Sequence, residues 1–185
     1  MKIEAFKDFL LDYNRNVNLV SRQLTREPLD ILINESLLLK NHISNVLVID
    51  AGSGGGLLGV PLAISLPEKK FILVETIHKK IIFLNEVLGR LKLDNASVWE
   101  GSVQEFMHHH GRFESTIISR GFPRIEALAD LVFKKRVREL VLISSINKIK
   151  KIGNHVANFR QNHYNIPSRD NLIIVKLENV SRETR

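Results

Sequence analysis

One short segment constrains the fold of this 185-residue chain more than any other. The apolar run VLVID occupies positions 46–50, and five glycines follow it between Gly52 and Gly59. Glycine loses more conformational entropy on folding than any other residue, so such a cluster indicates a backbone that needs positive φ values or a close approach by another group. A second apolar run, GVPLAISL, follows at 59–66. We therefore predict a strand, a tight loop and a helix, with a ligand lying against the loop.

Strands and helices alternate along the rest of the chain. Runs of apolar and β-favouring residues predict strands, and apolar residues three and four positions apart predict the helices between them. The predicted strands cover 46–50, 70–76, 96–101, 115–120, 139–145 and 171–178, and the predicted helices cover 59–66, 77–91, 103–110 and 124–136. This alternation predicts an α/β fold with a mostly parallel sheet flanked by helices. The segment between the last two strands has no periodicity, so we expect a long loop or a hairpin there.

The chain before the first strand is predicted to be helical. Apolar residues between Ala5 and Tyr13 share one helical face, and a second helix is predicted over 27–41. A chain of this length most often forms one domain with its own core. We therefore expect a single domain, with an N-terminal helical extension over 1–44 and an α/β core over 45–185.

Composition excludes several classes of protein. The chain has no cysteine, which rules out disulfides and thiolate metal sites. No run approaches the roughly 18 apolar residues of a membrane-spanning helix, and the N-terminus carries acids where a signal peptide would be apolar. The run His108–His110 predicts no metal site, because successive residues on a helix point in different directions. We expect a cytoplasmic protein that binds neither a metal nor a membrane.

The charge balance favours a polyanionic partner. Lysine and arginine number 27 against 20 acids, which gives a net charge of +7. Much of the excess lies in two segments, FKKRVREL at 133–140 and NKIKKIGN at 147–154. Local basic clusters of this kind are typical of nucleic-acid binding, although a solvated basic face is the alternative.

Two glycine patterns overlap in the loop. The first is G-x-G-x-x-G, which fits Gly54–Gly59 and is the fingerprint of dinucleotide binding. That fingerprint begins directly at the end of the strand, whereas this match begins two residues after Gly52, the first glycine of the loop. A nicotinamide-dependent oxidoreductase therefore stays as an alternative.

The second pattern is D-x-G-x-G-x-G, formed by Asp50, Gly52, Gly54 and Gly56. It resembles the first motif of class I S-adenosylmethionine-dependent methyltransferases. In that family an acid at the end of the next strand binds the ribose hydroxyls of the cofactor, and Glu75 stands at that place. A carboxylate that accepts two hydroxyl bonds is a strong and oriented contact.

Five stretches in order narrow the resemblance to one family. They are NVNLVS (16–21), DAGSGGGLLGVPLAI (50–64), HKKIIFLNEV (78–87), SVQEF (102–106) and ISRGF (118–122). Together they resemble the bacterial small-subunit ribosomal RNA guanine-N7 methyltransferases, also known as glucose-inhibited division protein B. The resemblance implies a Rossmann-like class I fold, S-adenosylmethionine as cofactor, and 16S ribosomal RNA or the small ribosomal subunit as substrate.

The resemblance also implies the residues of the cofactor pocket. In the family, the glycine loop, the SVQEF turn and the arginine of ISR line this pocket, which here are Gly52, Leu57, Val103, Gln104 and Arg120. Together with the motif glycines Gly54 and Gly56 and with Glu75, they make eight expected cofactor-binding residues. Three alternative roles are considered for Arg120: binding the methionine carboxylate of the cofactor, binding an RNA phosphate, or forming a structural ion pair. Guanine N7 has a free lone pair and no proton to remove, so we predict catalysis by alignment and name no catalytic base.

The chain departs from the family pattern in two places. The family carries a histidine three residues before an Asp-Ser pair, whereas this chain has Leu32 before Glu35 and Ser36. The fifth strand of the family ends in Ala-Leu-Lys-Gly, and LVLISSIN has no lysine at that point. A non-catalytic RNA-binding relative therefore remains a second alternative. We expect a monomer.

Overall fold

A seven-stranded sheet forms the centre of the computed structural model, which describes residues 1–110, 114–134, 137–156, 159–167 and 169–179. The strands are β1 (Leu47–Ala51), β2 (Lys70–Glu75), β3 (Ala96–Glu100), β4 (Ser115–Arg120), β5 (Glu139–Ser145), β6 (Phe159–Ile166) and β7 (Arg169–Asn179). Their order is β3-β2-β1-β4-β5-β7-β6, and the first five are parallel. β7 runs antiparallel to both β5 and β6. The predicted α/β fold with a mostly parallel sheet is confirmed.

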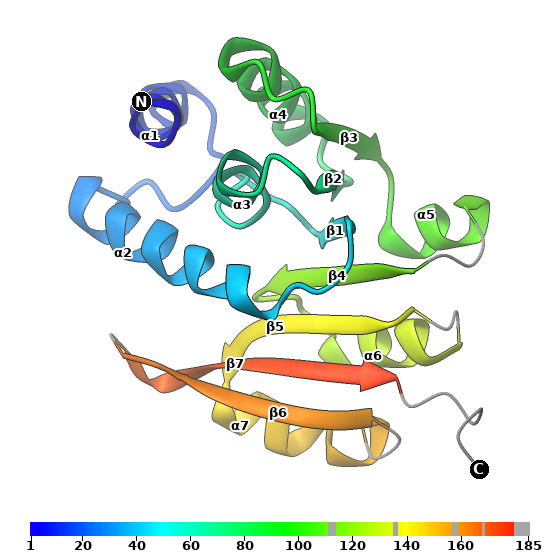
Figure 1. The fold of residues 1–185 in the computed structure, drawn as a ribbon. Coiled ribbons are helices and arrows are strands. Elements are labelled where there is room, and N and C mark those ends of the chain that lie inside the picture. Colours follow the sequence, from blue (N-terminus) through cyan, green and yellow to red (C-terminus); the bar gives the residue numbers. More distant parts are fainter. Residues whose placement is uncertain (111–113, 135–136, 157–158, 168, 180–185) are drawn as a thin grey trace.

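Helices cover both faces of this sheet (Figure 1). They are α1 (Lys2–Asn16), α2 (Arg26–Leu37), α3 (Gly59–Ser65), α4 (His78–Leu91), α5 (Val103–His110), α6 (Ile125–Lys134) and α7 (Ile146–Lys151), with short 3-10 helices η1 (Leu38–His42) and η2 (Gly153–Val156). Figure 1 shows α1, α3 and α4 on one side and α6 and α7 on the other. Right-handed crossovers between parallel strands place helices in this way.

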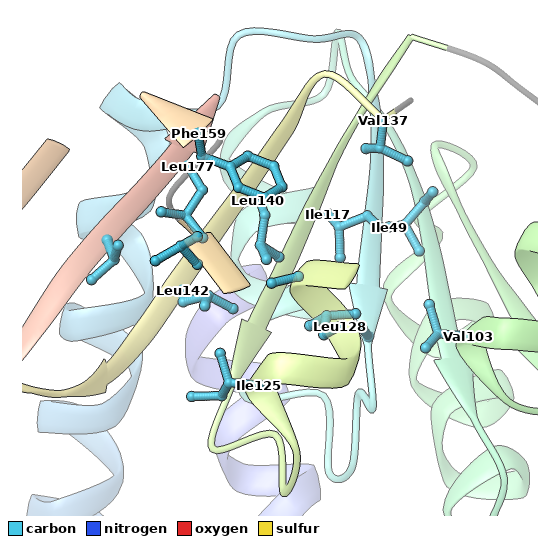
Figure 2. Close-up of a cluster of buried hydrophobic side chains, with 14 of the residues drawn as sticks. Ile49, Val103, Ile117, Ile125, Leu128, Val137, Leu140, Leu142, Phe159 and Leu177 are labelled. Atoms are coloured by element: carbon cyan, nitrogen blue, oxygen red, sulfur yellow. The ribbon is translucent and has the colours of Figure 1, made fainter. Parts of the chain in front are cut away.

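The core explains why the parallel strands read as near-continuous apolar runs. Alternate residues of a strand face opposite sides of the sheet, and here both sides are covered. Figure 2 shows one side, where strand residues such as Ile49, Ile117 and Leu142 pack against Leu128 of α6. All four are at most 1% exposed. Each side chain of this size contributes about 1.5–3 kcal/mol when fully buried.

The segment after β5 differs from the sequence expectation in detail. It contains α7, η2 and β6, and the alternative of a hairpin is confirmed by the pairing of β6 with β7. α7 has only six residues and is capped by Ser145, whose Oγ accepts the N–H of Lys148 at 3.3 Å. β6 is an edge strand in which only Phe159 and Ile166 are buried. Neither element is long or apolar enough to create a period in the sequence.

The N-terminal helices pack directly against the glycine loop. The predicted helix over 27–41 is α2 followed by the tighter turn η1. Asn14, at the end of α1, accepts the N–H groups of Leu19 and Val20 through Oδ1, at 2.9 and 3.1 Å. Val20 is thereby held over the loop, where a Cβ on Gly55 would lie only 2.8 Å from its Cγ1. The extension and the loop therefore share one packing unit.

No helix among the described residues is long and apolar enough to cross a membrane.

Candidate cofactor site

A cavity of about 280 Å³ opens where the parallel strands end. The carboxyl ends of β1, β2, β3 and β4 meet at one edge of the sheet, and residues at or just after each of these ends line the cavity. They are Gly52, Val74, Glu75, Thr76, Gly101, Ser102, Val103, Gln104, Arg120, Gly121, Phe122 and Pro123. Ligands of open α/β sheets bind at this edge. The glycine loop is thus at the place that its sequence context predicts.

Three alternate glycines give the loop its shape. Gly52, Gly54 and Gly56 have φ values of +76°, +60° and +74°, which side chains with a Cβ adopt only with strain. The N–H groups of Gly52 and Ser53 both donate to the carbonyl of Val74 at 3.0 Å. This pair of bonds joins the loop to the end of β2, and it brings the backbone of Gly52 into the wall of the cavity.

Asp50, the acid of the glycine motif, bonds the two ends of the loop together. Asp50 is buried at the end of β1, and its Oδ2 accepts the N–H of Gly59, the first residue of α3, at 3.0 Å. A Cβ on Gly59 would lie 2.6 Å from the same oxygen, so this contact requires glycine. Burial raises the pKa of Asp50 to about 7. Asp50 therefore supports the loop and does not line the cavity.

Glu75 is the acid that faces the cavity, and backbone groups hold it in place. Its Oε2 accepts the N–H of Gly54 at 2.8 Å, and its Oε1 accepts those of Thr76 and Ile77 at 2.8 and 2.9 Å. The side chain is buried, and these three bonds offset the cost of removing a carboxylate from water. A carboxylate offers about four acceptor sites, so Oε2 retains capacity for a ligand hydroxyl.

A capping box places the start of α5 at the cavity. The Oγ of Ser102 accepts the N–H of Glu105 at 3.2 Å, and Oε2 of Glu105 accepts the N–H of Ser102 at 2.7 Å. These reciprocal bonds fix the first turn of a helix; the bonds from Ser102 also lower the pKa of Glu105. Val103 and Gln104 follow the cap directly and line the cavity. The S-x-x-E pattern in SVQE was a signal for this cap in the sequence.

Arg120 connects the cavity to the N-terminal extension. It lines the cavity at the end of β4, but its guanidinium turns toward α2. There Nη2 pairs with the carboxylate of Glu35, and Nη1 donates to the carbonyl of Leu32 at 2.9 Å and to Oγ of Ser36 at 3.2 Å. Of the three roles open to Arg120, the structure shows the ion pair. Leu32 takes part in this contact through its backbone carbonyl, so the contact does not use the side chain at position 32.

Comparisons with known proteins agree with this geometry. Residues 1–161 match the model of the family described as rRNA small subunit methyltransferase G. The chain belongs to this family. A ribosomal RNA small subunit methyltransferase G from Brachyspira hyodysenteriae is 33% identical over 98% of this chain and 86% of its own length. One from Vibrio vulnificus is 35% identical over 64% of this chain, which spans 55% of that relative.

Solved structures show the same fold. A putative O-methyltransferase from Klebsiella pneumoniae superposes with a TM-score of 0.70 at 11% identity, covering 95% of this chain and 90% of that chain. At this level of identity the similarity concerns the fold alone. The chain therefore has the Rossmann-like class I methyltransferase fold expected from its motifs.

The structure brings together five of the eight residues predicted for the cofactor site of this methyltransferase G family member. The five that line one cavity are Gly52, Glu75, Val103, Gln104 and Arg120. Of the other three, Gly54 donates its N–H to Glu75, and a Cβ on it would meet only the carbonyl oxygen of Gly52, at 3.9 Å. A Cβ on Gly56 would lie 2.8 Å from Val60 and 3.0 Å from Leu84, and the carbonyl of Leu57 accepts the hydroxyl of Ser36 at 2.8 Å. Gly56 and Leu57 thus face the packing beneath the loop.

Sequence reasoning missed the remaining lining residues, although two of them repeat a signal that it used. Gly101 directly follows β3 and Gly121 directly follows β4, as Gly52 follows β1. All three have positive φ values. A glycine immediately after each of several predicted parallel strands therefore marks the same edge of the sheet.

Replacement of Glu75 by glutamine is expected to weaken binding of S-adenosylmethionine by about 1–3 kcal/mol, the contribution of a hydrogen bond to a charged group. An amide has one acceptor oxygen, so at least one of the three backbone N–H groups would face an NH2 group. Isothermal titration measures the change. The control is Glu100→Gln, because Glu100 pairs with Glu75 across β2 and β3 but is exposed. Equal affinity in wild type and Glu75→Gln would contradict the assignment.

Proposed function

We propose that this protein transfers the methyl group of S-adenosylmethionine to N7 of a guanine in small-subunit (16S) ribosomal RNA. The observation that carries the proposal is the cavity at the carboxyl edge, with the glycine loop and Glu75 in its wall, in a chain that belongs to the methyltransferase G family. S-adenosylmethionine supplies an electrophilic methyl group when bound. Family membership leaves the oxidoreductase alternative without support.

The residues present fit this cofactor. The backbone of Gly52 has no Cβ to fill the space beside the cavity, and Glu75 offers an acceptor oxygen for ribose hydroxyls. Val103 and Gln104 provide an apolar side chain and an amide at the start of α5, which suit the face and the edge of an adenine. We propose these four residues as the cofactor contacts. Phe122 and Pro123 line the cavity after β4, where an aromatic ring can stack on an unpaired base.

The chemical step asks little of the side chains. Guanine N7 carries a lone pair and loses no proton, so the protein acts by holding the base in line with the methyl group and by excluding other orientations. The test is methyl incorporation from labelled S-adenosylmethionine into small ribosomal subunits and into their free RNA, followed by mapping of the modified base. Cofactor binding without methyl transfer to either substrate would favour the non-catalytic alternative.

The two predicted basic segments lie at different edges of the sheet. α6 leads from the carboxyl end of β4 to the amino end of β5, so Lys134 and Arg138 lie at the edge opposite the cavity, and Arg138 pairs there with Glu114. Lys135 and Arg136 lie outside the described residues. The second segment begins directly after the carboxyl end of β5, where three lysines of α7 are exposed: Lys148, Lys150 and Lys151. The second segment is therefore better placed to meet RNA.

We expect alanine at Lys148, Lys150 and Lys151 to weaken RNA binding and to flatten its salt dependence, with cofactor affinity unchanged. Each phosphate contact with a single strand contributes a slope of about −0.7 to log affinity against log salt, because neutralised phosphates release counterions. The control is Lys134→Ala combined with Arg138→Ala, which removes two cations at the opposite edge. Binding isotherms at several salt concentrations give the slopes. A wild-type affinity that does not depend on salt would refute the RNA substrate.

A further inference from the structure

Two arginines from distant parts of the chain meet at one buried acid. Glu35 of α2 is 2% exposed; its Oε2 pairs with Arg120 of β4, and its Oε1 accepts Nε of Arg169 at 2.9 Å. One carboxylate therefore neutralises only part of the charge of two guanidinium groups. The cluster of Glu35, Arg120 and Arg169 therefore carries a net positive charge, and it lies beside the cavity that Arg120 lines.

The two arginines differ in exposure and in which nitrogens of the guanidinium group bond to the protein. The side chain of Arg120 is 17% exposed, and both of its terminal nitrogens bond to α2. The side chain of Arg169 is 44% exposed, and its closest contact to Glu35 is made by Nε. A guanidinium has five N–H donors in a planar fork. The exposed terminal part of Arg169 can therefore bond a further anion while Nε keeps it fixed to Glu35.

Strand register places Arg169 at the edge of the sheet that holds the cavity. Leu172 of β7 pairs with Ser145, the last residue of β5, and Arg169 comes three residues earlier in the antiparallel strand. It therefore lies beyond the carboxyl end of β5. The next residue, Asp170, is an exposed acid, but alternation along a strand directs it to the other face.

We propose that Arg169 binds a backbone phosphate of the RNA substrate next to the cavity. This inference rests on the proposed function. Arginine binds phosphate through two parallel N–H bonds, and the bond to Glu35 fixes the guanidinium in advance, so less side-chain entropy is lost on binding. Glu35 thus holds the guanidinium of Arg169 beside the cavity, where a nucleotide of the substrate must enter.

The test compares RNA affinity and its salt dependence in wild type, Arg169→Ala and Arg169→Gln. Glutamine keeps a donor for Glu35 without the charge, and Arg120 remains to neutralise that acid in both variants. We expect at least tenfold weaker RNA binding in both, as for loss of a bond to a charged group, and a slope shallower by about 0.7. S-adenosylmethionine affinity stays unchanged. Arg160→Ala is the matched control, because Arg160 is exposed in the same hairpin but pairs with Glu178 at its other end.

The outcomes separate this inference from the proposed function. If wild type binds and methylates RNA while both Arg169 variants bind it with wild-type affinity and slope, the inference is overturned and the function stands. If Arg160→Ala weakens binding as much as Arg169→Ala, the effect is one of net charge, and the inference is likewise overturned. If wild type neither binds nor methylates RNA, both fall together.

Discussion

Replacing Glu35 with leucine is expected to lower the free energy of unfolding by about 3–5 kcal/mol, the usual cost of removing one partner of a buried ion pair. The change removes the carboxylate that pairs with the guanidinium of Arg120. Because the side chain of Arg120 is only 17% exposed, water cannot fully replace this carboxylate. Arg169 is more exposed and can regain water, so most of the loss comes from Arg120. Urea denaturation without cofactor measures the effect.

The control for this change also removes the guanidinium of Arg120, which Glu35→Leu leaves buried without its carboxylate. Glu35→Leu combined with Arg120→Met replaces the pair by apolar side chains of similar volume, which is often neutral or stabilising in other proteins. We expect the double variant to regain most of the stability lost by Glu35→Leu. A single variant that loses less than about 1 kcal/mol would show that water reaches Arg120 and that the pair contributes little.

The second large effect concerns Asp50 and pH. Burial raises its pKa to about 7 from the ordinary value of 3.8, so between pH 3.8 and pH 7 the folded protein holds a proton that the unfolded chain has lost. The contribution of Asp50 to stability is therefore complete below about pH 4. It declines as pH rises to about 7, by roughly 4 kcal/mol in all.

Asp50→Asn tests this dependence, because asparagine keeps an acceptor for the N–H of Gly59 and has no proton to lose. We expect the stability of the variant relative to wild type to increase between pH 4 and 7 and then to level off. Thermal or urea unfolding of both proteins across this range gives the difference directly. Groups with lowered pKa values, such as Glu105, titrate equally in both proteins and cancel. Parallel pH profiles would mean that Asp50 stays charged when buried.

The interior strands could be predicted from the sequence because both of their faces are covered. β2 and β5 are apolar along most of their length, so a pattern of local residues was enough. β6 has the same backbone but lies at the edge of the sheet, and its residues between Phe159 and Ile166 are polar. Its pairing with β7 is a tertiary fact that no local period expresses.

The site could be predicted in part for a related reason. Positive φ values strongly favour glycine, so the spacing of the glycines was enough to predict the tight loop. The pattern does not tell a glycine that faces a ligand, such as Gly52, from one that packs against neighbours, such as Gly56. Nor could it show that Arg120 turns to Glu35, because that pairing depends on how α2 lies against the end of β4. Contacts between residues that are far apart in the sequence leave no local pattern from which they could be predicted.

The separation of Glu35 from its two arginines along the sequence matters during synthesis, because the chain is made from its N-terminus. Glu35 is synthesised 85 positions before Arg120 and 134 before Arg169, so on the ribosome the acid exists long before either cation. Until β4 has emerged, the guanidinium of Arg120 that neutralises this carboxylate has not been made, so burial of the acid by docking of α2 would be unfavourable. The cavity edge is therefore assembled late in synthesis, and the hairpin that carries Arg169 joins it last. A nascent chain of this protein stays open on the side where its cofactor will bind.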